Sequence, residues 1–152
     1  MTPNDPFMTQ DKFNELTKDL VLLKQKRPHA VSEVARLAEL GDFSENVEYQ
    51  QAKGRLRGIN NIILKIEYQL NHAEIIEAPK TGQVEIGSTV TVEIDSQTKI
   101  FTILGSSESN PSHGIISYSS PIGKMLFGKS VGETVELLSS ENPKKYTILS
   151  IT

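Results

Sequence analysis

The sequence contains no cysteine and no tryptophan, and it has no long apolar run. Without cysteine, a disulfide framework and a thiolate zinc site are both excluded. No apolar run approaches the ~20 residues of a membrane span, and the polar N-terminus lacks the apolar core of a signal peptide. The net charge of −3 argues against a general nucleic-acid coat protein, which would be basic. We therefore expect a cytoplasmic protein with no membrane partner, built as one domain or two small ones.

The apolar residues of the first half are arranged symmetrically about Phe43. Towards the N-terminus and towards the C-terminus the spacing alternates between three and four residues, which is the a/d pattern of a coiled coil. Arg27 and Ile59 occupy the one slot missing on each side. The two series are Leu37, Val34, Ala30, Leu23, Leu20, Leu16 and Phe13, and Tyr49, Ala52, Leu56, Ile63, Ile66, Leu70 and Ala73. The pattern predicts an antiparallel helical hairpin whose arms, of about thirty residues, extend roughly 45 Å.

The turn of this hairpin carries two acids, Asp42 and Glu45, and we call residues 41–46 the tip. Gly41 suits the end of the first helix, and Asp42 or Ser44 suits the N-cap of the second, which we expect to run from about Ser44 to Ala73. The acids have two interpretations. They are capping charges, or they bind a hard cation such as Mg²⁺. Two exposed carboxylates do not make a closed metal site, so a partner would have to supply the other ligands.

The first arm has two features of its own. Residues 1–9 contain Pro3 and Pro6 and suggest a loose leader, with Met8 as an alternative start, and Thr9 as the N-cap of a helix beginning near Asp11. Pro28 predicts a kink or a short break in the helix, because it removes a backbone donor and crowds the preceding turn.

The apolar period changes at residues 78–82, where Ala-Pro-Lys-Thr-Gly marks a domain boundary. We expect an N-terminal domain of residues 1–78 and a compact C-terminal domain of residues 79–152. Alternating or dense apolar segments predict strands at residues 88–94, 99–104, 114–118, 131–138 and 146–151, with a turn at 139–144. Residues 121–127 predict one short helix, with Pro121 in its first turn. The fold class is therefore α+β.

Four further patterns bear on function. Arg36 and the row Lys53, Arg55 and Arg57 form either an ordinary solvated surface or a surface that helps the acidic tip approach a phosphate backbone. Residues 123–130 match G-x-x-x-x-G-K-S, but the enclosed residues suggest a helix rather than a phosphate-binding loop, so we interpret this match as false. The histidines, His29, His72 and His113, show no ligand spacing, and Gly54 and Gly58 are interpreted as neutral surface positions.

Residues 41–49, Gly-Asp-Phe-Ser-Glu-Asn-Val-Glu-Tyr, together with Ala35-Arg36 and Ala52-Lys53, resemble the signature of the bacterial Gre transcript-cleavage factors. Residues 116–122 and 126–129 resemble the C-terminal domain of that family, closer to its GreA branch. The resemblance implies a hairpin that enters the secondary channel of a backtracked RNA polymerase, and a C-terminal domain with an FKBP-like fold. It implies a factor that is not itself an enzyme, has no small-molecule substrate, and stimulates the polymerase to cleave the RNA 3′ end.

The resemblance also implies roles for individual residues. Asp42 and Glu45 match the two catalytic acids, which would share the second Mg²⁺ of the polymerase, while Ser44, Asn46 and Tyr49 would shape the tip. The expected contacts with RNA or polymerase are Arg36, Lys53, Arg55, Arg57, Ser120, Pro121 and Ile122. Val47 replaces the usual alanine of the family. The alternatives are a channel-binding inhibitor with the same fold, a prolyl isomerase, and a structural coiled-coil adaptor.

Overall fold

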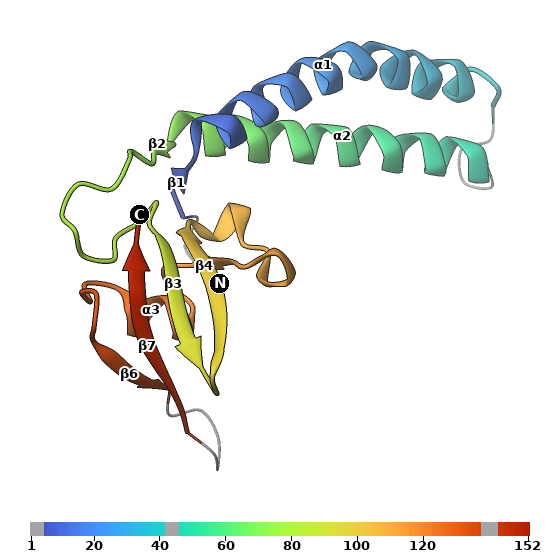
Figure 1. Cartoon of the computed structure of the whole chain (residues 1–152). Coiled ribbons are helices and arrows are strands. Elements are labelled where there is room, and N and C mark those ends of the chain that lie inside the picture. The colour runs from blue at the N-terminus through green and yellow to red at the C-terminus, as the bar shows by residue number, and fades with distance from the viewer. Residues whose placement is uncertain (1–4, 42–45, 138–142) are drawn as a thin grey trace. The chain divides into compact units, whose positions relative to one another are not determined.

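Two long helices form the first half of the chain. The computed structural model describes residues 5–41, 46–137 and 143–152, with helix α1 at Gln10–Ala38 and helix α2 at Val47–Asn71 (Figure 1). Lys24 of α1 forms an ion pair with Glu67 of α2 at 3.0 Å, and Arg27 Nε donates to Asn60 Oδ1 at 2.7 Å. These contacts confirm the antiparallel hairpin. Apart from the exposed Arg27, the seam positions within α1 and α2 are buried or half-buried.

The helix ends differ in part from the sequence expectations. Thr9 Oγ1 accepts a hydrogen bond from Lys12 N at 3.2 Å, so the predicted cap of α1 is confirmed. Pro28 lies inside α1, which continues past it without a break, although the ribbon bows near its middle (Figure 1). Helix α2 begins at Val47 rather than at Ser44, because Asn46 is its N-cap.

A loose leader was predicted at residues 1–9; residues 1–4 lie outside the described residues, and for residues 5–9 the prediction is wrong. Strand β1 (Phe7–Met8) pairs in parallel with strand β2 (Glu74–Ile75), and the Met8 side chain is 1% exposed. Thr9 donates from its amide and its hydroxyl to the two carboxylate oxygens of Glu108, both at 2.7 Å. This segment is therefore an integral part of the C-terminal unit.

The second half forms a five-stranded mixed sheet in the order β5-β4-β3-β7-β6. Only β4 and β5 run parallel; the other neighbours are antiparallel. The strands are β3 (Thr89–Ile94), β4 (Gln97–Leu104), β5 (Ile115–Ser117), β6 (Thr134–Leu137) and β7 (Lys144–Ile151). Short 3-10 helices at Ser106–Glu108 and Pro111–His113 separate β4 from β5. All five predicted strands are present, so the α+β class is confirmed.

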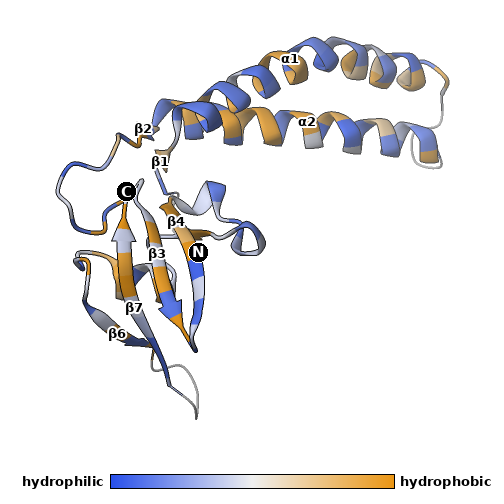
Figure 2. Ribbon diagram, in the orientation of Figure 1, coloured by the Kyte–Doolittle hydropathy of each residue, from blue (hydrophilic) through white to orange (hydrophobic). Residues whose placement is uncertain are grey.

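Helix α3 (Pro121–Leu126) covers the apolar face of this sheet, and Leu126 is fully buried. Figure 2 shows hydrophobic stretches on β3 and β7, where the alternation of strand side chains directs every second residue into the core. The buried cluster consists of Val84, Val90, Val92, Ile94, Ile103, Ile116, Leu126, Tyr146 and Ile148. The turn between β3 and β4 holds Asp95 and Ser96 at φ values of 51° and 60°, a left-handed conformation that favours glycine.

Contacts between residues divide the chain into two compact units, Phe13–His72 and the remainder. The remainder joins Met1–Lys12 to Ala73–Thr152, so the division lies just before the linker predicted at residues 78–82. Among the described residues, no helix is long and apolar enough to cross a membrane.

Candidate functional site

The tip joins the last turn of α1 to the first turn of α2. Asp42, Ser44 and Glu45 lie outside the described residues, and the residues on either side of them define the two ends of the tip. Leu37 is 2% exposed and anchors the end of α1, whereas Leu40 and Val47 are each 67% exposed. Gly41 has φ = +107°, a conformation that residues with a side chain rarely adopt. A predicted acidic segment is therefore held between two helix ends and flanked by exposed apolar side chains.

Asn46 fixes the point where α2 begins. Its backbone is extended, with φ = −87° and ψ = 95°, and its Oδ1 accepts a hydrogen bond from Tyr49 N at 3.0 Å. The prediction that Asp42 or Ser44 is the N-cap of α2 is therefore wrong, because the cap is Asn46. The N-terminus of α2 carries the positive end of the helix dipole, which favours anionic groups nearby.

Arg36 is engaged in an ion pair within α1. Its Nη2 lies 2.7 Å from Glu33 Oε1, and its Nε donates to Oε2 at 3.2 Å. This hydrogen bonding lowers the pKa of Glu33 below its usual value and raises the pKa of Arg36. Both side chains are solvated, so salt screens the pair. Binding RNA or polymerase through Arg36 would compete with Glu33.

The predicted basic row divides between two faces of the hairpin. Lys53 Nζ lies 5.3 Å from the centroid of the Tyr49 ring, within range of a cation–π contact. Lys53 and Arg57 line one hollow together with Asn60, whereas Arg55 lines a separate hollow. Helix geometry explains the division, because residues four apart share a face and residues two apart do not. The three cations therefore do not form one patch.

Two of the three residues predicted to contact the polymerase, at positions 120–122, have roles within the fold. Ser120 Oγ caps α3 by accepting from Gly123 N at 3.1 Å, and Ile122 packs against the core. Pro121, in the first turn, is exposed. Of these three residues, Pro121 presents the most surface to a partner.

The remaining motifs carry no site of their own. The G-x-x-x-x-G-K-S match runs through α3 itself, with Ser130 leading into a turn before β6, so the context of a phosphate-binding loop is absent from this described segment. His72 stacks on Tyr68, with ring centroids 4.0 Å apart, and His113 contacts Ser112. No group of three or more His, Cys, Asp or Glu suited to a metal occurs among the described residues.

Comparisons with known proteins match both halves of the chain. Residues 6–75 match the family model described as transcription elongation factor, N-terminal, and residues 78–152 match the model described as transcription elongation factor, GreA/GreB, C-term. The chain is 36% identical to transcription elongation factor GreA of Nitratiruptor sp., over 95% of this chain and 91% of that protein. It is 38% identical to the GreA of Mycoplasma capricolum, over 95% and 96%, and 37% identical to that of Chloroflexus aggregans, over 99% of each.

Among solved structures, the chain is similar to the GreA factor homolog 1 (Gfh1) protein of Thermus thermophilus. The alignment has a TM-score of 0.46 and 22% identity, and it covers 98% of this chain and 99% of that one.

Proposed function

Because the chain belongs to the GreA/GreB family of transcription elongation factors, we propose that it binds bacterial RNA polymerase and stimulates cleavage of backtracked RNA. The nuclease is the polymerase, and this protein acts as its accessory factor rather than as an enzyme. Cleavage creates a new RNA 3′ end in the active site and rescues an arrested complex. The observation that carries the proposal is the similarity to the GreA relatives, which extends over both units of the chain. The proposal places the protein in the cytoplasm, where a bacterial polymerase works.

The hairpin is the part that would enter the secondary channel of the polymerase. Its support comes from the shape of the unit formed by residues 13–72: two helices of 29 and 25 residues, α1 and α2, meet at the tip. At 1.5 Å per residue, a helix of this length spans roughly 40 Å. A reach of that order would carry two carboxylates from a surface into a buried active site. The backtracked RNA 3′ end would then lie beside the tip.

Asp42 and Glu45 would act there as part of a shared metal site. Carboxylate oxygens are the ligands that Mg²⁺ prefers, and two of them leave most of its coordination to other groups. The polymerase would supply those groups. When bound, Mg²⁺ supplies Lewis-acid stabilisation and a nucleophilic water for in-line hydrolysis. The task of this chain is to hold the two carboxylates, and Asn46 contributes by fixing the start of α2.

The test is RNA cleavage in a halted, backtracked elongation complex. The intact protein should accelerate cleavage, whereas Asp42→Asn and Glu45→Gln should bind the complex with similar affinity and lose most of the acceleration. Removal of one electrostatic catalytic group commonly costs 10²–10³ in rate, so we expect a loss of about that size. Glu39→Gln removes a nearby exposed carboxylate from outside the proposed site, and it should cleave like the intact protein.

Other outcomes would count against the proposal. An intact protein that binds the polymerase but slows both cleavage and elongation would be an inhibitor. A protein that does not bind the polymerase at all would contradict the proposed partner. Equal cleavage by the intact protein and by both variants would leave the acids as capping charges only.

A further inference from the structure

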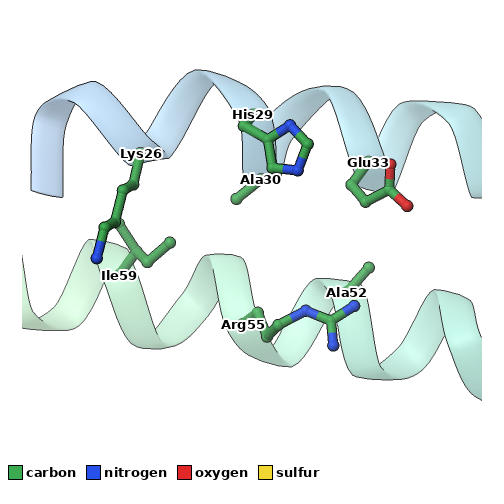
Figure 3. Close-up of a pocket in the computed structure, with 7 residues that line it drawn as sticks. All are labelled: Lys26, His29, Ala30, Glu33, Ala52, Arg55 and Ile59. Atoms are coloured by element: carbon green, nitrogen blue, oxygen red, sulfur yellow. The ribbon is translucent and has the colours of Figure 1, made fainter.

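A half-enclosed hollow of about 480 Å³ lies between the two arms of the hairpin (Figure 3). Its volume falls within the ~300–1,000 Å³ that is usual for small-molecule sites. Residues of α1 and α2 both contribute to it, and all of them belong to the unit of residues 13–72. The lining residues are Lys26, His29, Ala30, Glu33, Ala52, Arg55 and Ile59.

Small side chains in the seam produce this hollow. Ala30 and Ala52 each point towards the opposite helix in Figure 3, where a coiled coil usually places larger apolar residues. Ile59 continues the apolar surface along α2. Ala52 is 2% exposed, whereas Ala30 and Ile59 are half-buried, so the accessible apolar surface of this floor comes from Ala30 and Ile59. A flat apolar group would find a matching surface there.

The rim of the hollow is cationic. Figure 3 shows Lys26 reaching from α1 towards Ile59, and Arg55 extending from α2 beneath Glu33. Glu33 already accepts two hydrogen bonds from Arg36, so much of its charge is compensated. Within the described ranges, neither Lys26 nor Arg55 forms an ion pair. Lys26 and Arg55 therefore border an apolar floor, and Glu33, whose carboxylate interacts electrostatically with Arg55, lies on the same rim.

We propose that this hollow binds a nucleoside phosphate. The phosphate would lie between the Lys26 ammonium and the Arg55 guanidinium, since both groups donate charge-assisted hydrogen bonds to phosphate oxygens. The base would lie on the floor formed by Ala30, Ala52 and Ile59. A planar guanidinium also stacks on aromatic rings, which favours a base over an aliphatic group. This binding is separate from the proposed function, because it requires no polymerase and does not involve the tip acids.

The experiment is a titration of the intact protein with adenosine monophosphate, without polymerase or metal. Calorimetry gives the affinity, and amide chemical shifts identify the residues that respond. We expect shifts centred on the hollow and a dissociation constant in the range of about 0.1–1 mM, as befits an open site. Adenosine and inorganic phosphate should each bind at least about tenfold more weakly, because each makes only half of the contacts.

Substitutions distinguish binding in the hollow from nonspecific attraction of the phosphate to any positively charged side chain. Lys26→Gln and Arg55→Gln should each weaken binding about tenfold, which corresponds to about 1.4 kcal/mol. Lys65→Gln removes a cation of α2 that does not line the hollow, and it should bind like the intact protein. Ala30→Met should weaken binding by placing a longer side chain on the floor where the base would lie, and its helix content and melting temperature would show that the hairpin is intact.

A short RNA with and without a 5′-phosphate identifies the source of the ligand. Tighter binding of the phosphorylated RNA than of the mononucleotide, through the same two cations, would assign the hollow to an RNA end. Weaker binding would assign it to a free nucleotide. The proposal is overturned if adenosine monophosphate produces no shifts in the hollow, if inorganic phosphate binds equally well, or if Lys65→Gln weakens binding as much as Arg55→Gln. None of these results bears on cleavage by the polymerase.

Discussion

Substitution of Asn46 tests how the chain sets the position of its tip. Asn46→Ala removes the Oδ1 atom that accepts from Tyr49 N at 3.0 Å and leaves that amide to water. An N-cap exchanged for alanine typically costs about 1 kcal/mol. The extended backbone of Asn46 is open to serine and aspartate, which are comparable caps, so Asn46→Ser should recover most of the loss.

The effect should be visible in two measurements on the isolated protein. A loss of 1 kcal/mol lowers the melting temperature by about 4–8 °C in a unit the size of residues 13–72, followed by helical circular dichroism. The amide of Tyr49 should exchange its hydrogen about fivefold faster, because local opening of the first turn becomes easier by the same energy.

A matched substitution within α2 should have the opposite sign. Asn61 is exposed in the interior of the same helix, and alanine has the higher helix propensity, so Asn61→Ala should stabilise the hairpin by about 0.5 kcal/mol. If Asn46→Ala and Asn61→Ala shift the melting temperature in the same direction, the cap does not contribute as argued. Loss of stability in Asn46→Ser equal to that in Asn46→Ala would also refute the reasoning.

Four further outcomes are expected. Ser96→Gly should raise the free energy of unfolding by about 0.5–1 kcal/mol, because the left-handed φ of 60° no longer strains a side chain. Urea unfolding should show a higher midpoint, and an unchanged midpoint would contradict this. Gly54→Ala, where an added Cβ meets nothing within 4 Å, should raise the free energy of unfolding by up to about 1 kcal/mol, measured as a higher melting temperature. Thr9→Val should lose about 1–2 kcal/mol, since its hydroxyl both donates to Glu108 and caps α1, and Thr9→Ser should not. Because the pKa of Glu33 is lowered in the folded protein, its ion pair with Arg36 stabilises the fold above the pKa that Glu33 has in the unfolded chain. This stabilisation is lost as the pH falls through the folded-state pKa of Glu33, and a carboxyl titration by NMR should show that lowered pKa.

The hairpin could be predicted from the sequence because its pattern is long and periodic. Apolar spacing of three and four residues over two arms leaves one simple arrangement, and the bond from Arg27 to Asn60 confirms its register. The first residue of the second helix was harder to predict. Asp42, Ser44 and Asn46 are all competent caps, and composition alone does not choose among them. The structure places the cap at Asn46, which shortens the helix.

The N-terminal segment shows why a local pattern can mislead. Pro3 and Pro6 suggested a loose leader, yet Asp5 Oδ2 accepts from Ser106 N at 2.9 Å and Phe7 packs edge-to-face on Tyr118. These partners lie about a hundred residues away in the chain, and β1 is only two residues long. No periodic signal exists at that length, so pairing with β2 was not predictable from this sequence alone.

Some features of the candidate site follow from the helical period, whereas others depend on which residues of the two helices face each other. The separation of Lys53 from Arg55 follows from 3.6 residues per turn, so it could have been predicted from spacing alone. The hollow beside Arg55 could not be predicted in this way. The apolar pattern of the seam includes Ala30 and Ala52, but it does not show how much space their small side chains leave between the helices. The volume depends on which side chains face each other across two helices. For the same reason the sequence does not show that Lys26 and His29 line the same hollow as Arg55. Size at seam positions, rather than polarity, is therefore the property that indicates where a helical hairpin of this kind can hold a ligand.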